Sequence, residues 1–323
     1  MRRLPALVAV TALAGFGLVG CSASASSSCP TPTDSAIAST TDSAIASVVE
    51  ASGDFGTAPT VSVRSPFIPE TAGTQTLIQG DGQRITSDDQ LSLVDVTVFD
   101  AATGSQLVAT TYAADVKSAT PLPRLTQAIP AIAPLLHCVA EGSRVAVAIP
   151  GSELGTQGAQ ALGVNEGDGA VFVFDVRKVF LPAADGADQY NADSGMPSVV
   201  RAPDGTPGVV MPAGDAPTQV RSQTIKKGDG DVLAADSSVV IHVQGVAWGA
   251  TTTFASTWKN GAPGQATVSQ LPPALASALE GQTVGSQVLV VVPADQTAQD
   301  QQILKAPANA ALVYVIDVLG TVS

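Results

Sequence analysis

The sequence is poor in several residue types on which many protein functions depend. Aromatic residues make up 4% of its 323 residues and charged residues 13%, and there are two histidines and three cysteines. Lysine and arginine number 15 against 28 aspartate and glutamate, giving a formal net charge of −13. Such an acidic chain repels a phosphate backbone, which argues against nucleic-acid binding. The scarcity of histidine and cysteine argues against a structural zinc site, and we expect no metal or cofactor.

The sequence is, by contrast, rich in apolar residues. Hydrophobic residues account for 45% of the chain, enough to bury a core, which a disordered chain could not do. The length suggests about two domains. Beyond the N-terminus no apolar run approaches the roughly 20 residues of a membrane-spanning helix.

The N-terminus has the features of a secretion signal. Arg2 and Arg3 precede an apolar stretch at 4–19, and Leu18-Val19-Gly20-Cys21 is similar to a bacterial lipobox. We expect residues 1–20 to be a lipoprotein signal peptide and Cys21 to be lipidated; a plain signal peptide is the alternative. The Ser- and Ala-rich segment 21–54 then reads as a flexible tether that holds an extracytoplasmic protein at the membrane.

Two further cysteines remain after lipidation. Cys29 lies in the predicted tether and Cys138 follows a histidine inside an apolar segment. In an oxidising compartment we expect these two to form a disulfide, which would pin the tether to the first domain; two unpaired thiols are the alternative. A catalytic cysteine is not expected, because neither histidine has an evident orienting partner.

The chain contains a long internal repeat. Gly-Asp-Gly at 80–82 recurs at 228–230, and each copy is followed by an alternating apolar run. The matched segments are 91–98 with 239–246, 107–112 with 253–258, 139–150 with 282–293, and 171–176 with 313–318. Two copies of one domain explain this pattern economically.

Each copy reads as a β-sheet with one helix. Val-, Ile- and Leu-rich runs broken by Gly, Asp and Pro predict strands, and residues 125–139 and 271–279 predict helices. In the second helix Leu271, Leu275 and Leu279 form one apolar stripe. The segment 183–219 connects the copies, and its Val pairs at 199–200 and 209–210 are expected to lead into the second sheet.

The second copy resembles FKBP-type peptidyl-prolyl cis-trans isomerases over residues 223–319. The motifs that carry this resemblance are Lys-Gly-Asp-Gly-Asp at 227–231, Val-Ile-His-Val-Gln-Gly at 240–245 in place of V-x-Y-x-G, Phe254-Ala-Ser-Thr-Trp258, and the segments 279–287, 291–293 and 306–314. The first copy is a more diverged version. A lipobox before tandem domains resembles surface isomerase lipoproteins of actinobacteria.

The resemblance implies an α+β fold with two tandem FKBP-like domains. Each would be an antiparallel β-sheet wrapped around one short α-helix, with domains at 55–182 and 196–323 and a linker at 183–195. Such domains need no cofactor, and we expect a monomer.

Carried over residue by residue, the resemblance places the catalytic pocket in the second domain. Its lining would be Phe254, Leu271, Leu275 and Tyr314. Several family residues are replaced: the early-strand Tyr by Val243, the Asp after the strand Phe by Ala255, the helix Trp by Leu275 and a later aromatic by Gly264. Gln- and Asp-rich residues up to 302 replace the family's G-Y-G loop.

The first copy departs further from the family. Asp95 stands at the early Tyr position, Val108 at the strand Phe and Ile132 at the helix Trp, whereas Phe172 keeps the last-strand aromatic. His242, on an alternating strand of the second copy, is expected to face solvent.

Three hypotheses of function follow. The first is a surface-anchored prolyl isomerase of weak activity that acts on X-Pro segments of secreted or surface proteins and assists their folding. The alternative is a non-catalytic tandem module that binds extended apolar or Pro-containing segments. A structural spacer is a third and less favoured reading.

Overall fold

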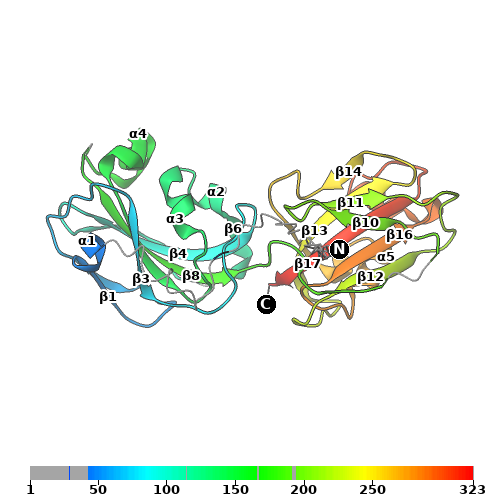
Figure 1. Cartoon of the computed structure of the whole chain (residues 1–323), viewed down its shortest axis with the longest axis horizontal. Coiled ribbons are helices and arrows are strands. Elements are labelled where there is room, and N and C mark those ends of the chain that lie inside the picture. The colour runs from blue at the N-terminus through cyan, green and yellow to red at the C-terminus, as the bar shows by residue number, and fades with distance from the viewer. Residues whose placement is uncertain (1–28, 30–42, 114, 166, 191–193, 323) are drawn as a thin grey trace, which may run out of the picture.

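The computed structural model describes residues 29, 43–113, 115–165, 167–190 and 194–322. They form two domains that lie end to end along the long axis of the molecule (Figure 1). The predicted signal peptide and the lipidation site Cys21 lie outside the described residues. No helix in the described part of the chain is long and apolar enough to cross a membrane.

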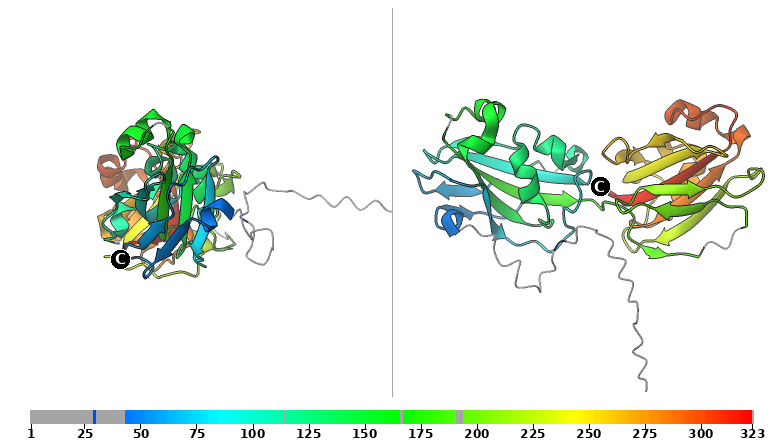
Figure 2. Two further views of the ribbon diagram at one scale, coloured as in Figure 1. Left: turned by 90° about the vertical axis from the view of Figure 1, so that its left-hand side faces the viewer. Right: turned by 45° about the horizontal axis from the view of Figure 1, so that its top comes forward.

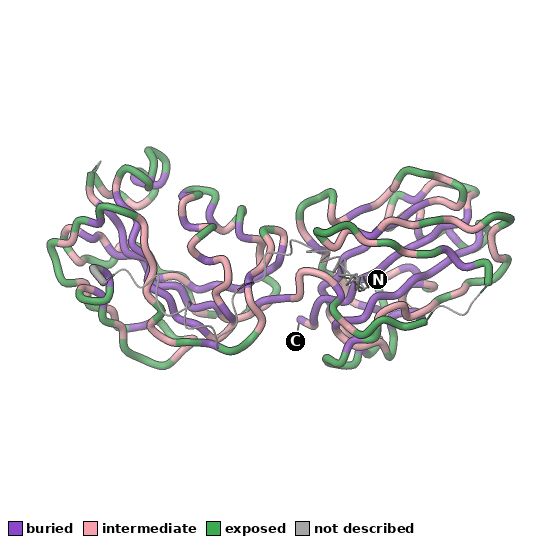
Figure 3. Tube along the Cα trace, in the orientation of Figure 1, coloured by how far each residue is buried: buried purple, intermediate pink, exposed green. Residues whose placement is uncertain are grey.

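An antiparallel sheet forms the first domain. Its strands are β3 (Gly73–Ile78), β4 (Leu91–Asp100), β5 (Gln106–Ala109), β6 (Thr120–Pro121), β7 (Arg144–Ile149) and β8 (Ala170–Val179). They lie in the order β3-β7-β8-β4-β5, and β6 pairs with β4. The two long central strands β4 and β8 are almost entirely buried (Figure 3).

The second domain repeats this topology. Its strands are β9 (Ala187–Asp188), β12 (Arg221–Lys227), β13 (Ser238–Ala247), β14 (Thr253–Ser256), β15 (Gly264–Thr267), β16 (Gln287–Val292) and β17 (Leu312–Thr321). Their order is β14-β13-β17-β16-β12-β9, and β15 pairs with β13. With β9 set aside, the two sheets have the same strand order.

Details of hydrogen bonding repeat as well. The Gly80 amide donates to the Ser143 hydroxyl at 2.9 Å, and the Gly228 amide donates to the Ser286 hydroxyl at 3.0 Å. The chain is therefore an α+β protein made of two tandem domains of the same topology, as its sequence predicts.

Short helices cover one face of each sheet, called the helix face below. In the second domain α5 (Pro273–Leu279) places Leu275 and Leu279 in the core, as the apolar stripe predicts. In the first domain the predicted helix at 125–139 is broken by prolines into α2 (Leu122–Leu125), a 3-10 turn (Pro130–Ile132) and α3 (Ala133–Leu136). Two other helices were not predicted: α4 (Gly151–Leu162) and α6 (Ala298–Ile303).

A two-stranded hairpin covers the opposite, outer face of each sheet. In the first domain α1 (Ser43–Ala46), β1 (Val49–Ser52) and β2 (Thr60–Val63) bury Ile45 and Val49 against that face. In the second domain β10 (Ser198–Arg201) and β11 (Pro207–Val210) pack in the same way. The expectation that residues 43–54 belong to a flexible tether is therefore wrong, and the Val pairs of β10 and β11 form a separate hairpin rather than joining the main sheet.

One buried ion pair fastens the first hairpin. Arg144 on β7 contacts both carboxylate oxygens of Asp175 on β8, at 2.6 and 2.8 Å, and both side chains are buried. The same guanidinium donates to backbone carbonyls of the loop after β1, those of Gly53, Asp54 and Thr57. The buried Arg144 guanidinium thus neutralises the buried Asp175 carboxylate, and its remaining N–H groups bind the hairpin that covers the sheet.

The two domains meet through a small apolar cluster. Leu91 and Phe180 of the first domain pack with Val240, Leu319 and Val322 of the second. The Phe180 ring lies so close to Gly320 that a Cβ there would come within 2.5 Å of it. The predicted linker is therefore not free: β9 within it pairs with β12, and the Ala184 amide donates to Asp317.

A disulfide joins Cys29 and Cys138, the pair expected from the sequence. Cys138 follows α3, so the bond attaches the N-terminal segment to the helix face of the first domain.

We predict that Arg144→Met destabilises the first domain by about 3–5 kcal/mol, because it leaves the Asp175 carboxylate buried without its cation. Chemical denaturation of the full chain measures this loss. The double variant Arg144→Met/Asp175→Leu removes both charges and should recover most of the lost stability. Equal losses in the single and double variants would contradict this role of the ion pair.

Candidate functional site

The structure brings the four predicted pocket residues together on the helix face of the second domain. Phe254 lies on β14, Tyr314 on β17, Leu271 just before α5 and Leu275 within it. All four belong to one apolar cluster, called the aromatic site below. The Phe254 and Tyr314 rings meet edge to face with centroids 5.7 Å apart, a favoured aromatic geometry.

Burial divides these four residues into two pairs. Leu275 is 1% exposed and Tyr314 is 0% exposed, whereas Phe254 and Leu271 are half-buried. In this structure, therefore, only Phe254 and Leu271 present surface, and the expected floor of the pocket is covered.

The glycine of the V-x-Y-x-G motif has a clear steric role. A Cβ on Gly245 would lie 2.5 Å from the Phe254 ring, so a side chain on β13 would displace that ring. Gly245 also pairs with Tyr314 across the sheet. The glycine therefore leaves room for the outer end of the Phe254 ring beside Tyr314.

One polar residue of the site was missed from the sequence. Asp300 on α6 accepts a 2.7 Å hydrogen bond from the Tyr314 hydroxyl through Oδ1. Its Oδ2 is buried and has no hydrogen-bond partner among the described residues. Burial raises the pKa of the Asp300 carboxyl, and burial together with this contact raises that of Tyr314. The Gln- and Asp-rich segment gave no sign that one of its carboxylates turns inward.

The first domain carries no comparable group at this place. Phe172 pairs with Val98 as Tyr314 pairs with Gly245, so Phe172 is the counterpart of Tyr314. Helix α4 contributes buried Leu154 and Ala159 to the core on that side. The equivalent of the aromatic site is thus filled by apolar side chains.

Strand register also corrects two assignments in the first domain. Val96, not Asp95, is the counterpart of Val243: the Val96 amide donates to the Thr110 hydroxyl, and the Val243 amide donates to the Thr257 hydroxyl in the same way. Asp95 instead lies on the outer face, where it forms an ion pair with Arg177 at 3.1 Å.

The second correction concerns Phe254, whose counterpart is Leu107 rather than Val108. Val108 pairs with Val98 across the sheet as Ala255 pairs with Gly245, so Leu107 occupies the position before it, as Phe254 does.

His242 does not face solvent, contrary to expectation. It is 1% exposed, stacks on Trp258 at 4.3 Å and shares a 2.7 Å hydrogen bond between Nδ1 and the Thr257 hydroxyl. Its Nε2 lies 3.9 Å from the Asp89 carboxylate of the first domain. Burial lowers the pKa of His242 to about 4, although the Asp89 charge acts in the opposite direction. The residue is a buried, neutral part of the domain contact.

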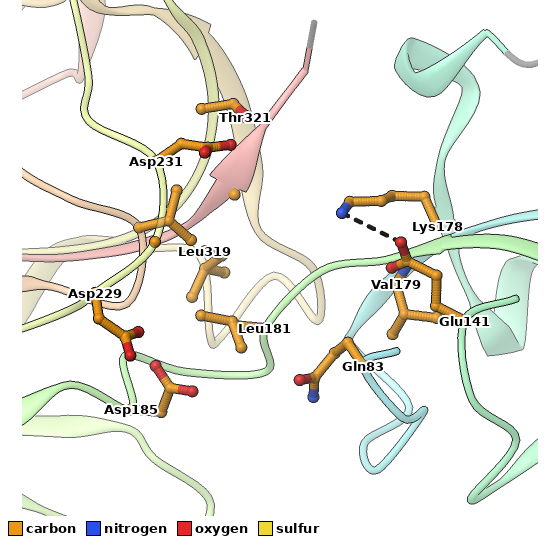
Figure 4. Close-up of a pocket in the computed structure, with 13 residues that line it drawn as sticks. Gln83, Glu141, Lys178, Val179, Leu181, Asp185, Asp229, Asp231, Leu319 and Thr321 are labelled. Atoms are coloured by element: carbon orange, nitrogen blue, oxygen red, sulfur yellow. Dashed lines mark hydrogen bonds and ion pairs between the residues drawn. The ribbon is translucent and has the colours of Figure 1, made fainter. Parts of the chain in front are cut away.

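A cavity of about 360 Å³ lies between the domains. Figure 4 shows Glu141 and Lys178 of the first domain, joined by an ion pair, opposite Asp185, Asp229 and Asp231. Among the described residues no group of three or more side chains is placed to hold a metal ion.

The aromatic site lies between a short helix and the antiparallel sheet of an α+β domain. Residues 230–319 match the family model described as FKBP-type peptidyl-prolyl cis-trans isomerase. The second domain therefore belongs to the family of FKBP-type peptidyl-prolyl isomerases.

Several solved structures are similar to the chain. The three FKBP domains of wheat FKBP73 match with 14% identity and a TM-score of 0.34, over 78% of this chain and 94% of that one. FkpA from Escherichia coli matches with 17% identity and a TM-score of 0.30, over 40% of this chain and 53% of its own. A multi-domain immunophilin from Arabidopsis thaliana matches with 21% identity and a TM-score of 0.29, over 35% and 48%. No curated protein matches the chain.

The buried histidine makes the protein sensitive to acid. The unfolded chain binds a proton at His242 below about pH 6.5, whereas the folded protein does so only near the lowered pKa of about 4. His242 therefore makes its full contribution to the unfolding free energy above pH 6.5. As the pH falls to 4, roughly 3 kcal/mol of this contribution is lost.

We predict that His242→Asn reduces this acid sensitivity. The difference in unfolding free energy between variant and wild type should change by up to about 3 kcal/mol between pH 7 and pH 4. The buried carboxyls of Asp300 and Asp317, whose pKa values are raised by burial, act in the opposite sense but cancel in this difference. An NMR titration that placed the His242 midpoint near 6.5 would contradict the prediction.

Proposed function

We propose that the protein is a peptidyl-prolyl cis-trans isomerase whose second domain carries the activity. The observation that supports this most is the convergence of Phe254, Leu271, Leu275 and Tyr314 on the helix face of a domain that matches the family model. Rotation about an X-Pro bond faces a barrier of ~18–20 kcal/mol, because twisting the amide breaks its resonance. No nucleophile or metal is needed.

The chemistry follows from desolvation. A proline ring held against Phe254 and Leu271, which present surface, leaves water and enters an apolar environment. Twisting moves charge off the carbonyl oxygen, so the twisted amide loses less by leaving water than the planar amide does. A dry, apolar site therefore favours the twisted state over the ground state.

We expect the activity to be weak. Val243 and Ala255 place no hydroxyl or carboxylate where the family has a Tyr and an Asp. Leu275 and Tyr314 are covered, so a substrate reaches them only after neighbouring side chains move.

The alternative function is a tandem module that binds extended apolar or Pro-containing segments without catalysis. The filled helix face of the first domain, with Leu154 and Ala159 of α4 in its core, favours this role for that domain. The first domain would then support the second through the Phe180 contact rather than act on substrates itself.

We further propose an extracytoplasmic location. The signal-like N-terminus and the lipobox at 18–21 would anchor the chain through Cys21. Its substrates would then be X-Pro segments of secreted or surface proteins, whose folding it would assist.

We predict that the full chain accelerates isomerisation of an X-Pro peptide and that Phe254→Leu lowers kcat/KM about tenfold, a loss of about 1.4 kcal/mol in the transition state. The matched control is Leu107→Val, at the equivalent position of the first domain, which should leave kcat/KM unchanged. A protease-coupled assay measures both. No acceleration above the spontaneous rate, or equal losses in the two variants, would contradict catalysis by the second domain.

Anchoring is tested by Cys21→Ser in cells that process bacterial lipoproteins. Because the acyl chains would be attached to this cysteine, we expect the variant to leave the membrane fraction or to retain its uncut signal. Fractionation with mass spectrometry of the N-terminus distinguishes these forms. A processed variant that still partitions with membranes would refute the proposal.

A further inference from the structure

The second domain contains a buried carboxylate that the apolar mechanism does not use. Asp300 is 1% exposed, and its Oδ2 has no hydrogen-bond partner among the described residues. A buried carboxylate oxygen without a partner is costly, and such a group in a folded protein calls for an explanation.

Its position connects it with the aromatic site. Oδ1 lies 2.7 Å from the Tyr314 hydroxyl, and the Tyr314 ring is in contact with Phe254. The Tyr314 bond therefore fixes the orientation of the carboxylate at one end of the site and leaves the second oxygen free.

The fold itself does not require this pair. The counterpart of Tyr314 in the first domain is Phe172, which has no hydroxyl, and α4 packs there through buried Leu154 and Ala159. The same sheet is thus covered on this side by apolar contacts alone. A purely structural origin for the Tyr314–Asp300 bond is therefore disfavoured.

When the carboxyl is ionised, the free oxygen can accept hydrogen bonds but cannot donate them. Its strongest partner is therefore a cationic donor. The nearest lysine along the chain, Lys305, is not this partner, because its ammonium donates to the Gln302 carbonyl. A cation on the substrate would also be drawn to the protein by the net charge of −13.

We propose that Asp300 is a specificity-determining residue that selects peptide segments with a lysine or arginine beside the proline. This inference rests on the proposed isomerase function and adds its substrate class. The cationic side chain donates to Oδ2 while the proline ring lies against Phe254, and Tyr314 keeps the carboxylate oriented. Since Asp300 is covered, α6 moves aside as the peptide enters.

The test compares three peptide series on the full chain, with lysine, norleucine or glutamate placed directly before or directly after the proline. Norleucine has the length of lysine without its charge. We expect kcat/KM for lysine to exceed that for norleucine roughly tenfold at one of the two positions, and glutamate to be the poorest. Equal values for lysine and norleucine at both positions would overturn the proposal.

Two variants distinguish the effect of the Asp300 carboxylate from that of the protein's overall negative charge. Asp300→Asn retains the shape and an oxygen for Tyr314 but removes the charge, and it should abolish the preference for lysine. Asp295→Asn removes an exposed carboxylate from the same segment and should retain the preference. Equal losses in the two variants would overturn the proposal.

Binding separates this proposal from the proposed function. Calorimetric titration of the same peptides measures lysine preference even if no peptide is isomerised. Preferential binding of lysine peptides without turnover supports the specificity role of Asp300 and refutes isomerisation. Turnover without a preference for lysine supports isomerisation and refutes the role of Asp300. If Asp300→Asn fails to fold, Tyr314→Phe releases the carboxylate and should reduce the preference; an undiminished preference in that variant would overturn the role of the pair.

Discussion

The structure depends on one constraint: each sheet is apolar on both faces, and its short helices can cover only one of them. The central strands β4, β8, β13 and β17 are buried almost along their whole length, which is unusual for an antiparallel sheet. A second cover is therefore needed on each outer face. The hairpins β1–β2 and β10–β11 supply it, and this is why residues 43–54 of the predicted tether and the Val pairs at 199–200 and 209–210 belong to the domains (Figure 2).

Covering the outer faces also buries charge. Asp175 and Asp317 occupy equivalent positions on β8 and β17, and both are fully buried. The first domain solves this with Arg144 on the neighbouring strand, and the second uses Gln287 at the same place together with the Ala184 amide. In the first domain this ties the sheet to the covering hairpin, and in the second it ties the sheet to the linker at Ala184. The polar groups of the outer faces thus serve attachment.

Periodicity and repetition made the fold predictable, and their limits explain the errors. The repeat located the strands, but an alternating pattern sets the face of each residue only when the register is known, and one residue of slip reverses it. Asp95 and Val108 were each placed one position away from the true counterpart for this reason. His242 alternated correctly away from the helix face, but its burial depends on Asp89 and Trp258, which no local pattern brings together.

The residues of the aromatic site that lie on strands could be predicted from the sequence, and the residue that lies on a connecting segment could not. Phe254 and Tyr314 follow from strand motifs, whereas Asp300 lies in a segment whose composition suggests an exposed loop. The corresponding segments, α4 and α6, differ between the two domains. In the first, apolar residues of α4 complete the core; in the second, α6 inserts a carboxylate beside an aromatic hydroxyl. Since the sheets share topology and hydrogen bonding, selection for stability alone would favour the apolar solution in both. The polar solution in the second domain is therefore the feature of this duplicated fold that points most directly to a function.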